Sequence, residues 1–403
     1  MKVLVTAKHI YDANNEKLVG FTSGLGTMMQ SLLNEIGKNE EVFFFPTDAF
    51  LLKDYTTENY TILHNYSLCA IRKIPIVLKM YKKENNSKEL ISLKGIRQTV
   101  YLSTFLATLN KIRPDIVHIN SFNKFSFYLI KICEEKKIPF ILTGHNYFGK
   151  NSQALGYEEM KEYGQKILER DNIFISLMSS GAKRKVMEDY PDIGTDKIRL
   201  IYNGTNKKVF PTKVNIREKL NIQNKKKILL CVGNLIERKN QLQIVRAYAM
   251  LKKEYQDDIV VIFCGKDKMD GKLQQLIEKC KLKKNLLCVG AVPVQDMNDY
   301  YLQADGVISA SLMEGFPMVF AEAFVYGVPI IFPCGLDIEE DLSDENIGYK
   351  VNDSSDEAFK EAIEKWYYRK WDKEYIKEFS ERFKLEDIAQ QYVKYYKEIL
   401  EVH

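Results

Sequence analysis

The sequence predicts two doubly wound α/β domains, each built on a parallel β-sheet. Short apolar segments alternate with longer helical patterns along the whole chain, which is typical of βα units. The apolar segments are nearly continuous, as expected for strands that are buried on both faces of a sheet. At 403 residues, the chain is also too long for one ordinary core and long enough for two.

The expected strands fall into two sets. In the first half they are 2–7, 42–45, 116–120, 140–143, 173–178 and 198–202. In the second half they are 227–232, 258–264, 286–289, 306–310 and 329–333. Between the sets, 206–226 is rich in Lys and Asn and is the expected linker.

We therefore predict a first Rossmann-like domain over 1–205, a second over 206–384, and a C-terminal helix within 385–403. The pattern of that helix allows it to cross back onto the first domain but does not show which surface it covers. In doubly wound sheets, ligands bind beyond the carboxyl ends of the strands, so a cleft between two facing domains is the expected site.

Composition narrows the class of protein. Hydrophobic residues make up 45% of the chain and charged residues 28%, which is typical of a globular protein. The net charge of +5 is mild, and no basic stripe carries interleaved aromatic residues, so no nucleic-acid partner is expected. The seven cysteines include no Cys-x-x-Cys pair, which argues against a disulfide framework or a zinc site.

We expect a cytoplasmic protein. The first residues read as a strand and are too short for the apolar core of a signal peptide. The longest apolar stretch, 315–335, is interrupted by Glu322 and by three prolines, so it is not a membrane span. The stretch 71–99 carries eight basic and two acidic residues among apolar ones. It fits either a solvated helix face or peripheral contact with the anionic inner face of a membrane.

The stretch 311–324 carries the strongest signal for a binding site. A strand is expected to end near Ser311, and Gly315 leads into Pro317, a favourable first residue for a helix. The free N–H groups and the positive dipole end of that helix would bind an anion. Glu322 lies among apolar residues, so its carboxylate needs hydrogen-bond donors, which a ribose diol could supply. Alternatively, Glu322 pairs with an internal base and Glu314 is a solvated loop residue.

A second signal follows the strand that is expected to end at Val232. Arg238 and Lys239 would lie at the start of a helix, where cations oppose the helix dipole unless an anion is bound between them. Such groups could stabilise the charge of a departing nucleoside diphosphate without a metal ion. Two solvated basic side chains are the alternative interpretation.

Two weaker signals lie in the first half. Ser23 and Gly24 precede a helix expected at 28–36, where glycine would permit close approach of a phosphate or sugar, although an ordinary turn also fits. His145 follows a strand through Gly144, at a carboxyl end where it could contact a sugar or an acceptor. His118 lies inside a strand and fits a packed core residue better. Because no Asp-x-Asp occurs, no metal site is expected.

Together these segments resemble the retaining glycosyltransferases of family 4, which have the GT-B fold of two Rossmann-like domains facing across a cleft. The segment from Glu314 to Glu322 is similar to that family's Glu-x7-Glu motif. The resemblance implies that Glu314 contacts the donor sugar and that Glu322 binds the ribose. It also implies that the intervening residues hold the donor's phosphate or sugar; they are Gly315, Phe316, Pro317, Met318 and Val319.

Other segments extend the resemblance over nearly the whole chain. The stretch from Gly233 to Lys239 is similar to the family's Gly-Arg-Leu…Lys-Gly segment, which implies that Lys239 binds the diphosphate. Ser23 and Gly24 resemble the N-terminal Gly-Gly turn, and 143–145 resembles the Thr-x-His turn. Val292 follows a strand and a glycine that lie near the base in the family.

Several positions depart from the family pattern: besides Asn234 and Asn120, Ser23 replaces a Gly, Asn206 an Asp and Asn240 a Gly. Asn234 stands where the family usually has Arg, which leaves Arg238 as a substitute for that charge. Asn120 stands where the family frequently has a second His.

The resemblance implies transfer of a hexose or hexosamine, with retention, from a nucleotide diphosphate sugar to a hydroxyl acceptor. The acceptor would be a glycan or lipid-linked glycan, as in surface polysaccharide biosynthesis, and a UDP-sugar is favoured over a GDP-sugar. The residues expected to carry the reaction are Lys239, Arg238, Glu314 and His145, with no cofactor and no metal. The main alternative is a catalytically silent subunit that binds nucleotide sugar; a sugar-nucleotide epimerase or a phosphorylase ranks lower.

Overall fold

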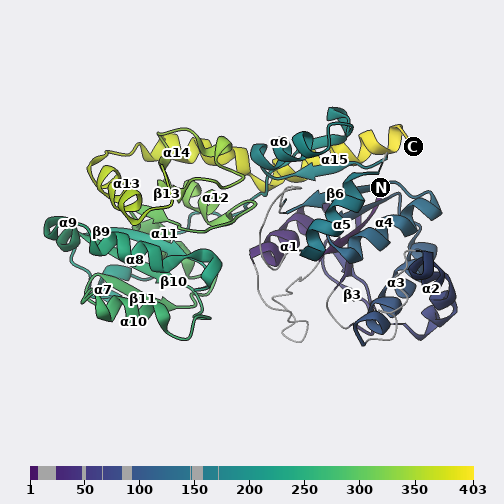
Figure 1. Ribbon diagram of the computed structural model, residues 1–403, viewed down its shortest axis with the longest axis horizontal. Coiled ribbons are helices and arrows are strands. Elements are labelled where there is room, and N and C mark those ends of the chain that lie inside the picture. The colour runs from purple at the N-terminus through teal and green to yellow at the C-terminus, as the bar shows by residue number, and fades with distance from the viewer. Residues whose placement is uncertain are drawn as a thin grey trace. The chain divides into compact units, whose positions relative to one another are not determined.

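The computed structural model describes residues 1–7, 24–47, 51–65, 67–83, 93–145, 147, 158–170 and 172–403. The chain divides into two compact units (Figure 1). Unit 1 comprises Met1–Gly204 and Leu385–His403, and unit 2 comprises Thr205–Lys384. The stretch 206–226, expected as a linker, therefore belongs to unit 2.

Unit 1 is built on an eight-stranded sheet with the strand order β3-β4-β2-β1-β5-β6-β7-β8. Neighbouring strands run parallel except for the antiparallel pair β3 and β4. The strands are β1 (Lys2–Ala7), β2 (Glu41–Pro46), β3 (Tyr55–Thr56), β4 (Tyr60–Ile62), β5 (Ile116–Asn120), β6 (Phe140–Gly144), β7 (Ile175–Leu177) and β8 (Ile198–Leu200). Every residue of β5 and β6 is buried, because helices cover both faces of the sheet.

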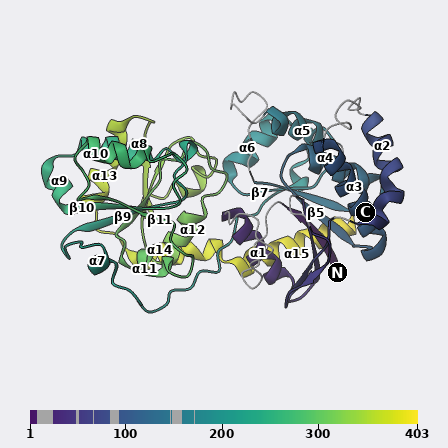
Figure 2. The same cartoon turned by 90° about the horizontal axis from the view of Figure 1, so that it is seen from below.

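The helices of unit 1 form two layers (Figure 2). Helices α3 to α6 cover one face of the sheet, with α2 packed on α3, and α1 and α15 pair on the other face. The helices are α1 (Gly24–Ile36), η2 (Leu68–Lys73), α2 (Ile74–Lys83), α3 (Leu93–Ile112), α4 (Lys124–Lys136), α5 (Glu158–Leu168), α6 (Ser180–Asp189), η4 (Thr195–Lys197) and α15 (Leu385–Glu401).

The C-terminal helix α15 completes the core of unit 1. Its buried positions recur at helical spacing: Leu385, Ile388, Ala389, Tyr392, Tyr395, Tyr396 and Ile399. The Tyr396 hydroxyl lies 2.7 Å from Nδ1 of the buried His118 on β5, whose Nε2 lies 2.6 Å from the Thr143 hydroxyl on β6. Arg199 and Glu398 add an ion pair of 2.9 Å at the half-exposed end of the helix.

Unit 2 is built on a six-stranded parallel sheet with the order β11-β10-β9-β12-β13-β14. Counted from its own first strand, this is the 3-2-1-4-5-6 order of a Rossmann fold. The strands are β9 (Lys227–Val232), β10 (Ile259–Cys264), β11 (Leu286–Gly290), β12 (Gly306–Ile308), β13 (Ile330–Pro333) and β14 (Gly348–Val351). The order of the connections reverses between β9 and β12, which pair directly.

Helices cover both faces of this second sheet (Figure 2). Helices α8, α10 and α13 pack together on one face, and α7, α11, α12 and α14 lie on the other. The helices are α7 (Ile216–Lys219), η5 (Glu237–Lys239), α8 (Gln241–Ala249), α9 (Lys253–Asp258), α10 (Lys272–Lys279), α11 (Met297–Gln303), α12 (Met318–Val325), η6 (Glu340–Leu342), α13 (Asp356–Tyr368), α14 (Lys373–Ser380) and η7 (Glu381–Phe383). No helix in the described ranges is both long and apolar enough to cross a bilayer.

The structure confirms the two α/β sheets and differs from the expectation in details. The short strands β3, β4 and β14 were not expected. Helix α1 begins at Gly24, earlier than the expected residue 28, and β12 ends at Ile308, before Ser311. These differences arise at the ends of elements, where local sequence determines the boundary least.

Candidate functional site

The two strongest sequence signals meet at the point of unit 2 where the connection order reverses. Strands β9 and β12 are parallel neighbours, so the loops that follow them leave the same edge of the sheet. The loop after β9 contains 233–240, and the loop after β12 contains 309–317. The backbone N–H of Leu312 donates to the carbonyl oxygen of Arg238 at 2.9 Å, and the Arg238 guanidinium donates to the carbonyl oxygen of Met313. The two loops are thus joined directly.

Glu314 and the two basic side chains form one charged cluster, which we call the 238/239/314 cluster. The Lys239 ammonium lies 2.5 Å from Oε1 of Glu314, and the Arg238 guanidinium lies 3.5 Å from the same atom. The side chains are 38%, 19% and 12% exposed for Arg238, Lys239 and Glu314, respectively. Two cations and one carboxylate leave the cluster with excess positive charge, which favours binding of an anion.

Helix α12 begins shortly after Glu314 in the sequence. Its N-cap is Pro317, which has no side-chain oxygen to accept from the first turn, and no acidic residue occupies that turn. The amides of Met318 and Val319 are therefore without a side-chain cap, and the positive end of the helix dipole is uncompensated by local acidic residues. Gly315, Phe316 and Pro317 are buried in the loop that leads to the helix.

Glu322 lies one turn further along α12 and is half-buried rather than fully buried. The Tyr301 hydroxyl on α11 donates to its Oε2 at 3.0 Å. Burial raises the pKa of the Glu322 carboxyl, and the charge of Lys207 and the Tyr301 hydrogen bond oppose that shift. The Tyr301 ring stacks on Tyr326 at a centroid distance of 5.2 Å, which holds the hydroxyl in place. The carboxylate thus lies in a partly apolar site that favours further hydrogen-bond donors.

The other residues of unit 2 that the resemblance implied line the same edge of the sheet. Gly233 follows β9 with a φ of 138°, a value that favours glycine. Asn234 is exposed and Val292 is half-buried in the loop after β11. Gly265, after β10, lies so close to this loop that a Cβ there would come within 1.9 Å of the Gly233 carbonyl oxygen. The strand ends are packed backbone to backbone at this point.

In unit 1, His145 follows β6 and is half-buried. Its Nε2 lies 2.8 Å from Oδ1 of Asn120, the last residue of β5. Burial lowers the pKa of His145 to about 3, so the ring is neutral. Gly24 begins α1. Ser23, the remaining predicted contact, lies outside the described residues.

Sequence reasoning missed several neighbours of the predicted residues. The Tyr301 hydroxyl donates to Glu322, and the charge of Lys207 opposes the rise in the pKa of Glu322. Asn120 forms a hydrogen bond with His145. Asn120 was noted only as a departure from the family pattern. Tyr301 and Lys207 carry no local signal, because their role depends on contacts between distant parts of the chain.

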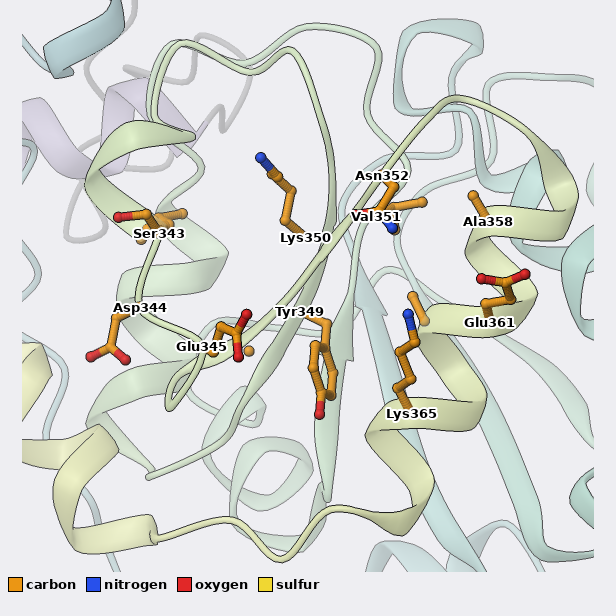
Figure 3. A pocket seen from close by; sticks show the side chains of 13 residues that line it. Ser343, Asp344, Glu345, Tyr349, Lys350, Val351, Asn352, Ala358, Glu361 and Lys365 are labelled. Carbon is orange, nitrogen blue, oxygen red and sulfur yellow. The ribbon is translucent and has the colours of Figure 1, made fainter.

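Two further observations concern a cavity in unit 2 and the groups that could bind a metal ion. A cavity of about 400 Å³ lies between β14, α13 and the segment before β14, and Tyr349, Lys350 and Lys365 line it (Figure 3). None of the predicted site residues is among its lining residues. Within the described ranges, no three His, Cys, Asp or Glu side chains gather as they would around a metal ion.

Within the basic stretch 71–99 that the sequence singled out, 71–83 lie in η2 and α2 and 93–99 lie in α3, whereas 84–92 lie outside the described residues. Its described surface combines apolar and basic side chains. Ile71 and Ile76 are 57% and 43% exposed. Arg72 and Lys79 are exposed on the same two helical segments.

Comparison with known proteins identifies two family regions. The family model described as "Glycosyl transferases group 1" matches residues 212–384. The model described as "Glycosyltransferase Family 4" matches residues 86–208. The first match lies within unit 2, and the second lies in unit 1 except for its last residues, 205–208. Both units therefore contribute to the family assignment.

Characterised relatives are distant. An alpha-monoglucosyldiacylglycerol synthase of Acholeplasma laidlawii is 24% identical over 268 residues, which cover 60% of this chain and 64% of that protein. The capsular polysaccharide biosynthesis glycosyltransferase CapH of Staphylococcus aureus is 25% identical over 242 residues, which cover 53% of this chain and 65% of CapH. The aligned segments therefore span less than two thirds of either relative.

Solved structures share the fold over the full chain. Sucrose-phosphate synthase from Thermosynechococcus elongatus aligns with a TM-score of 0.75 at 17% identity and covers 100% of both chains. Anabaena HepE in complex with UDP and glucose aligns with a TM-score of 0.67 at 13% identity and covers 99% of this chain and 100% of HepE. At these identities the similarity establishes the fold.

The environment of Glu322 predicts a stability difference that depends on pH. Because its folded-state pKa is raised, the free energy of unfolding falls as the pH rises from the pKa of the unfolded chain through the folded-state pKa. Replacement by glutamine removes the ionisation. We expect Glu322→Gln to melt at a higher temperature than the parent at neutral pH, with the difference shrinking toward roughly pH 4, below the ordinary pKa of glutamate.

Thermal unfolding of the ligand-free protein, followed at several pH values, measures this difference. Glu361→Gln, at an exposed position on α13, is the matched control and should show no such trend. A Glu322→Gln melting temperature below that of the parent at neutral pH would contradict the interpretation.

Proposed function

Because the chain belongs to the family 4 glycosyltransferases and has the GT-B fold, we propose that it transfers a hexose or hexosamine from a nucleotide diphosphate sugar to a hydroxyl group. We further propose that the anomeric configuration is retained and that the acceptor is a glycan or lipid-linked glycan of a surface polysaccharide or glycolipid. The names of the A. laidlawii and S. aureus relatives, which refer to a glycolipid and a capsular polysaccharide, support this class of acceptor.

The 238/239/314 cluster is the observation that carries the proposal. As the bond between the sugar and the diphosphate breaks, negative charge grows on the departing phosphate oxygen. Arg238 and Lys239 supply positive charge within a half-buried site, where its effect is larger than in water. The uncapped amides at the start of α12 add hydrogen-bond donors for the same anion. These groups could fill the role that a divalent ion has in other transferases, so we propose a metal-independent reaction.

Glu322 would bind the ribose of the donor. A ribose diol offers two O–H donors, which match the two oxygens of a carboxylate. Tyr301 already donates to Oε2 and so orients the carboxyl group. Ribose hydroxyls would offset the cost of keeping this carboxylate ionised in a partly buried position. Glu314 would orient the sugar beside the diphosphate.

Retention requires the acceptor oxygen to bond to the anomeric carbon on the face that the diphosphate leaves. The acceptor's proton would pass to the departing phosphate oxygen as the bond from carbon to that oxygen breaks. Lys239 and Arg238 would then hold a nucleoside diphosphate as the product. This mechanism follows the family, and a UDP-sugar is the favoured donor; HepE, which shares the fold, was solved with UDP and glucose.

One observation favours the alternative of a catalytically silent binding subunit. Asn234 is exposed where the family usually carries Arg, so one positive charge is missing at this position. The alternative predicts binding of nucleotide sugar without turnover. Transfer to any glycan or lipid acceptor, or hydrolysis of the donor, excludes it.

We also propose that η2 and α2 of unit 1 contact an anionic membrane surface, which suits a lipid-linked acceptor. Exposed isoleucines can enter the headgroup region, and basic side chains near an anionic surface contribute about 1 kcal/mol each. The exposed positions Ile71, Arg72, Ile76 and Lys79 support this orientation.

Removal of the Lys239 ammonium tests the role of the cluster. We expect Lys239→Ala to lower kcat/KM for transfer from a UDP-sugar by roughly 10²- to 10³-fold, the usual effect of losing one group that stabilises developing charge. The parent should remain active in EDTA. Lys350→Ala is the matched control, because Lys350 forms a similar 2.7 Å ion pair with Glu339 at the cavity of Figure 3. Unchanged activity of Lys239→Ala would exclude the mechanism.

Replacement of Glu314 separates diphosphate binding from sugar orientation. In the free protein Glu314 neutralises Lys239, so a diphosphate must compete with it. We expect Glu314→Gln to bind UDP roughly two- to fivefold more tightly, which corresponds to an ion pair of about 0.5–1 kcal/mol. Transfer should nevertheless become slower, because the sugar loses its carboxylate contact. Calorimetric titration with UDP measures the first effect, with Glu339→Gln as control; weaker UDP binding would contradict the competition.

Charge reversal tests the membrane contact. We expect the parent to float with vesicles of phosphatidylglycerol and the double variant Arg72→Glu, Lys79→Glu to remain in solution. The control variant Lys136→Glu, Arg184→Glu makes the same change in net charge at other exposed positions of unit 1 and should float like the parent. Equal flotation of both variants, or no flotation of the parent, would dismiss the contact.

A further inference from the structure

Asn120 and His145 come together where two neighbouring central strands of unit 1 end. Asn120 is the last residue of β5, and His145 follows β6 directly. The strands are parallel, with Asn120 opposite Thr143 in the register. The Asn120 side chain is buried, and it bridges from His145 to the backbone of β1 on the other side of β5.

The orientation of the Asn120 amide follows from its partners. One end of the amide lies 3.1 Å from the carbonyl oxygen of Thr6 on β1. A backbone carbonyl oxygen can only accept a hydrogen bond, so the amide nitrogen must face Thr6. The amide oxygen must then face His145, 2.8 Å from its Nε2. The amide orientation is therefore assigned from the Thr6 carbonyl oxygen, which can only accept a hydrogen bond.

The same reasoning fixes the proton on the histidine. An amide oxygen only accepts, so Nε2 of His145 must carry a hydrogen and donate it. Burial keeps the ring neutral. In a neutral imidazole only one nitrogen is protonated, so Nδ1 carries a lone pair and acts as an acceptor. Nδ1 is buried and finds no hydrogen-bond partner in the described part of the chain.

The backbone before His145 leaves little freedom to change this arrangement. A Cβ at Gly144 would come within 2.2 Å of Cε2 of Phe122, so the chain passes the ring as closely as a glycine allows. Among the described residues, His118 on the same strand as Asn120 interacts electrostatically with His145. Both His118 nitrogens have partners within 2.7 Å, and burial keeps this ring neutral too.

We propose that Asn120 is a positioning residue that holds His145 in the Nε2–H tautomer, so that Nδ1 accepts a hydrogen bond from a hydroxyl group of the substrate. The chemistry of the ligand follows: an O–H or N–H group can bind Nδ1, whereas a phosphate or carboxylate oxygen cannot. His145 would therefore recognise a sugar hydroxyl and not the diphosphate. The identity of the ligand rests on the proposed function, but the tautomer does not.

Nitrogen chemical shifts of the ligand-free protein test the tautomer directly. Protonated and unprotonated imidazole nitrogens differ widely in shift, so long-range ¹H–¹⁵N spectra of protein labelled only in histidine identify each tautomer. The chain has five histidines, so single replacement by glutamine assigns every signal. We expect His145 to show a protonated Nε2 and an unprotonated Nδ1 that do not change over roughly pH 5 to 8, where an unperturbed histidine titrates. A protonated Nδ1 in the parent overturns the proposal without any variant.

Two variants test whether Asn120 is the cause. Asn120→Leu removes the acceptor at similar size, and we expect His145 to populate the Nδ1–H tautomer as well. Asn120→Asp places a carboxylate against Nε2, which favours the imidazolium, so His145 should titrate at higher pH than in the parent. As the pH falls, Nδ1 of this variant becomes a donor. A His145 tautomer and titration identical to the parent in both variants would overturn the role of Asn120.

Transfer assays on the same variants separate this proposal from the proposed function. If the protein is a transferase and the tautomer matters, Asn120→Asp should lose activity toward low pH along the His145 titration, while the parent does not. Full activity of Asn120→Asp with a protonated His145 would overturn the hydroxyl contact. Absence of transfer in the parent would instead reject the proposed function and leave the tautomer measurement valid.

Discussion

The parallel pairing of β9 with β12 is the constraint on which the candidate site of unit 2 depends. The two strands lie at the centre of the sheet, and the chain continues from them in opposite directions. The loops that follow their carboxyl ends therefore leave the same edge of the sheet. Segments near residues 238 and 314, distant in sequence, are brought close enough to exchange hydrogen bonds and an ion pair. Because these loops begin at strands of the buried sheet, the core positions the residues at the start of each loop.

The charges at this site are not fully compensated within the described part of unit 2. Lys239 and Glu314 pair closely, but Arg238 adds a second cation that the same carboxylate cannot fully neutralise. Glu322 is kept in a position where burial opposes its ionisation. Such groups are unfavourable in a free protein and become favourable when an anion or a diol supplies the missing partners. Both features lie at one edge of one sheet, as the proposed donor site requires.

The surroundings of His118 and His145 in unit 1 differ in one respect. His118 is enclosed by Tyr396 and Thr143, which satisfy both ring nitrogens and attach α15 to the sheet. His145 has one nitrogen satisfied by Asn120 and the other without a partner in the described ranges. Burying a polar atom without a partner costs about 1–3 kcal/mol, and we propose that a substrate hydroxyl supplies the partner of Nδ1. His118 attaches α15 to the sheet, and His145 is the residue that we propose contacts the substrate.

The sequence alone determined the two α/β sheets and the loops that carry the predicted site residues of unit 2, because both leave local signals. Continuous apolar runs identify strands such as β10 and β13, and the residues around Lys239 and Glu314 mark the loops that follow strands. Two-residue strands such as β3 are too short to show periodicity, so they were missed. The partners Tyr301, Lys207 and Asn120 and the docking of α15 were decided by the tertiary structure. Each depends on which distant groups meet and which of them can donate, and no local pattern of residues carries that information.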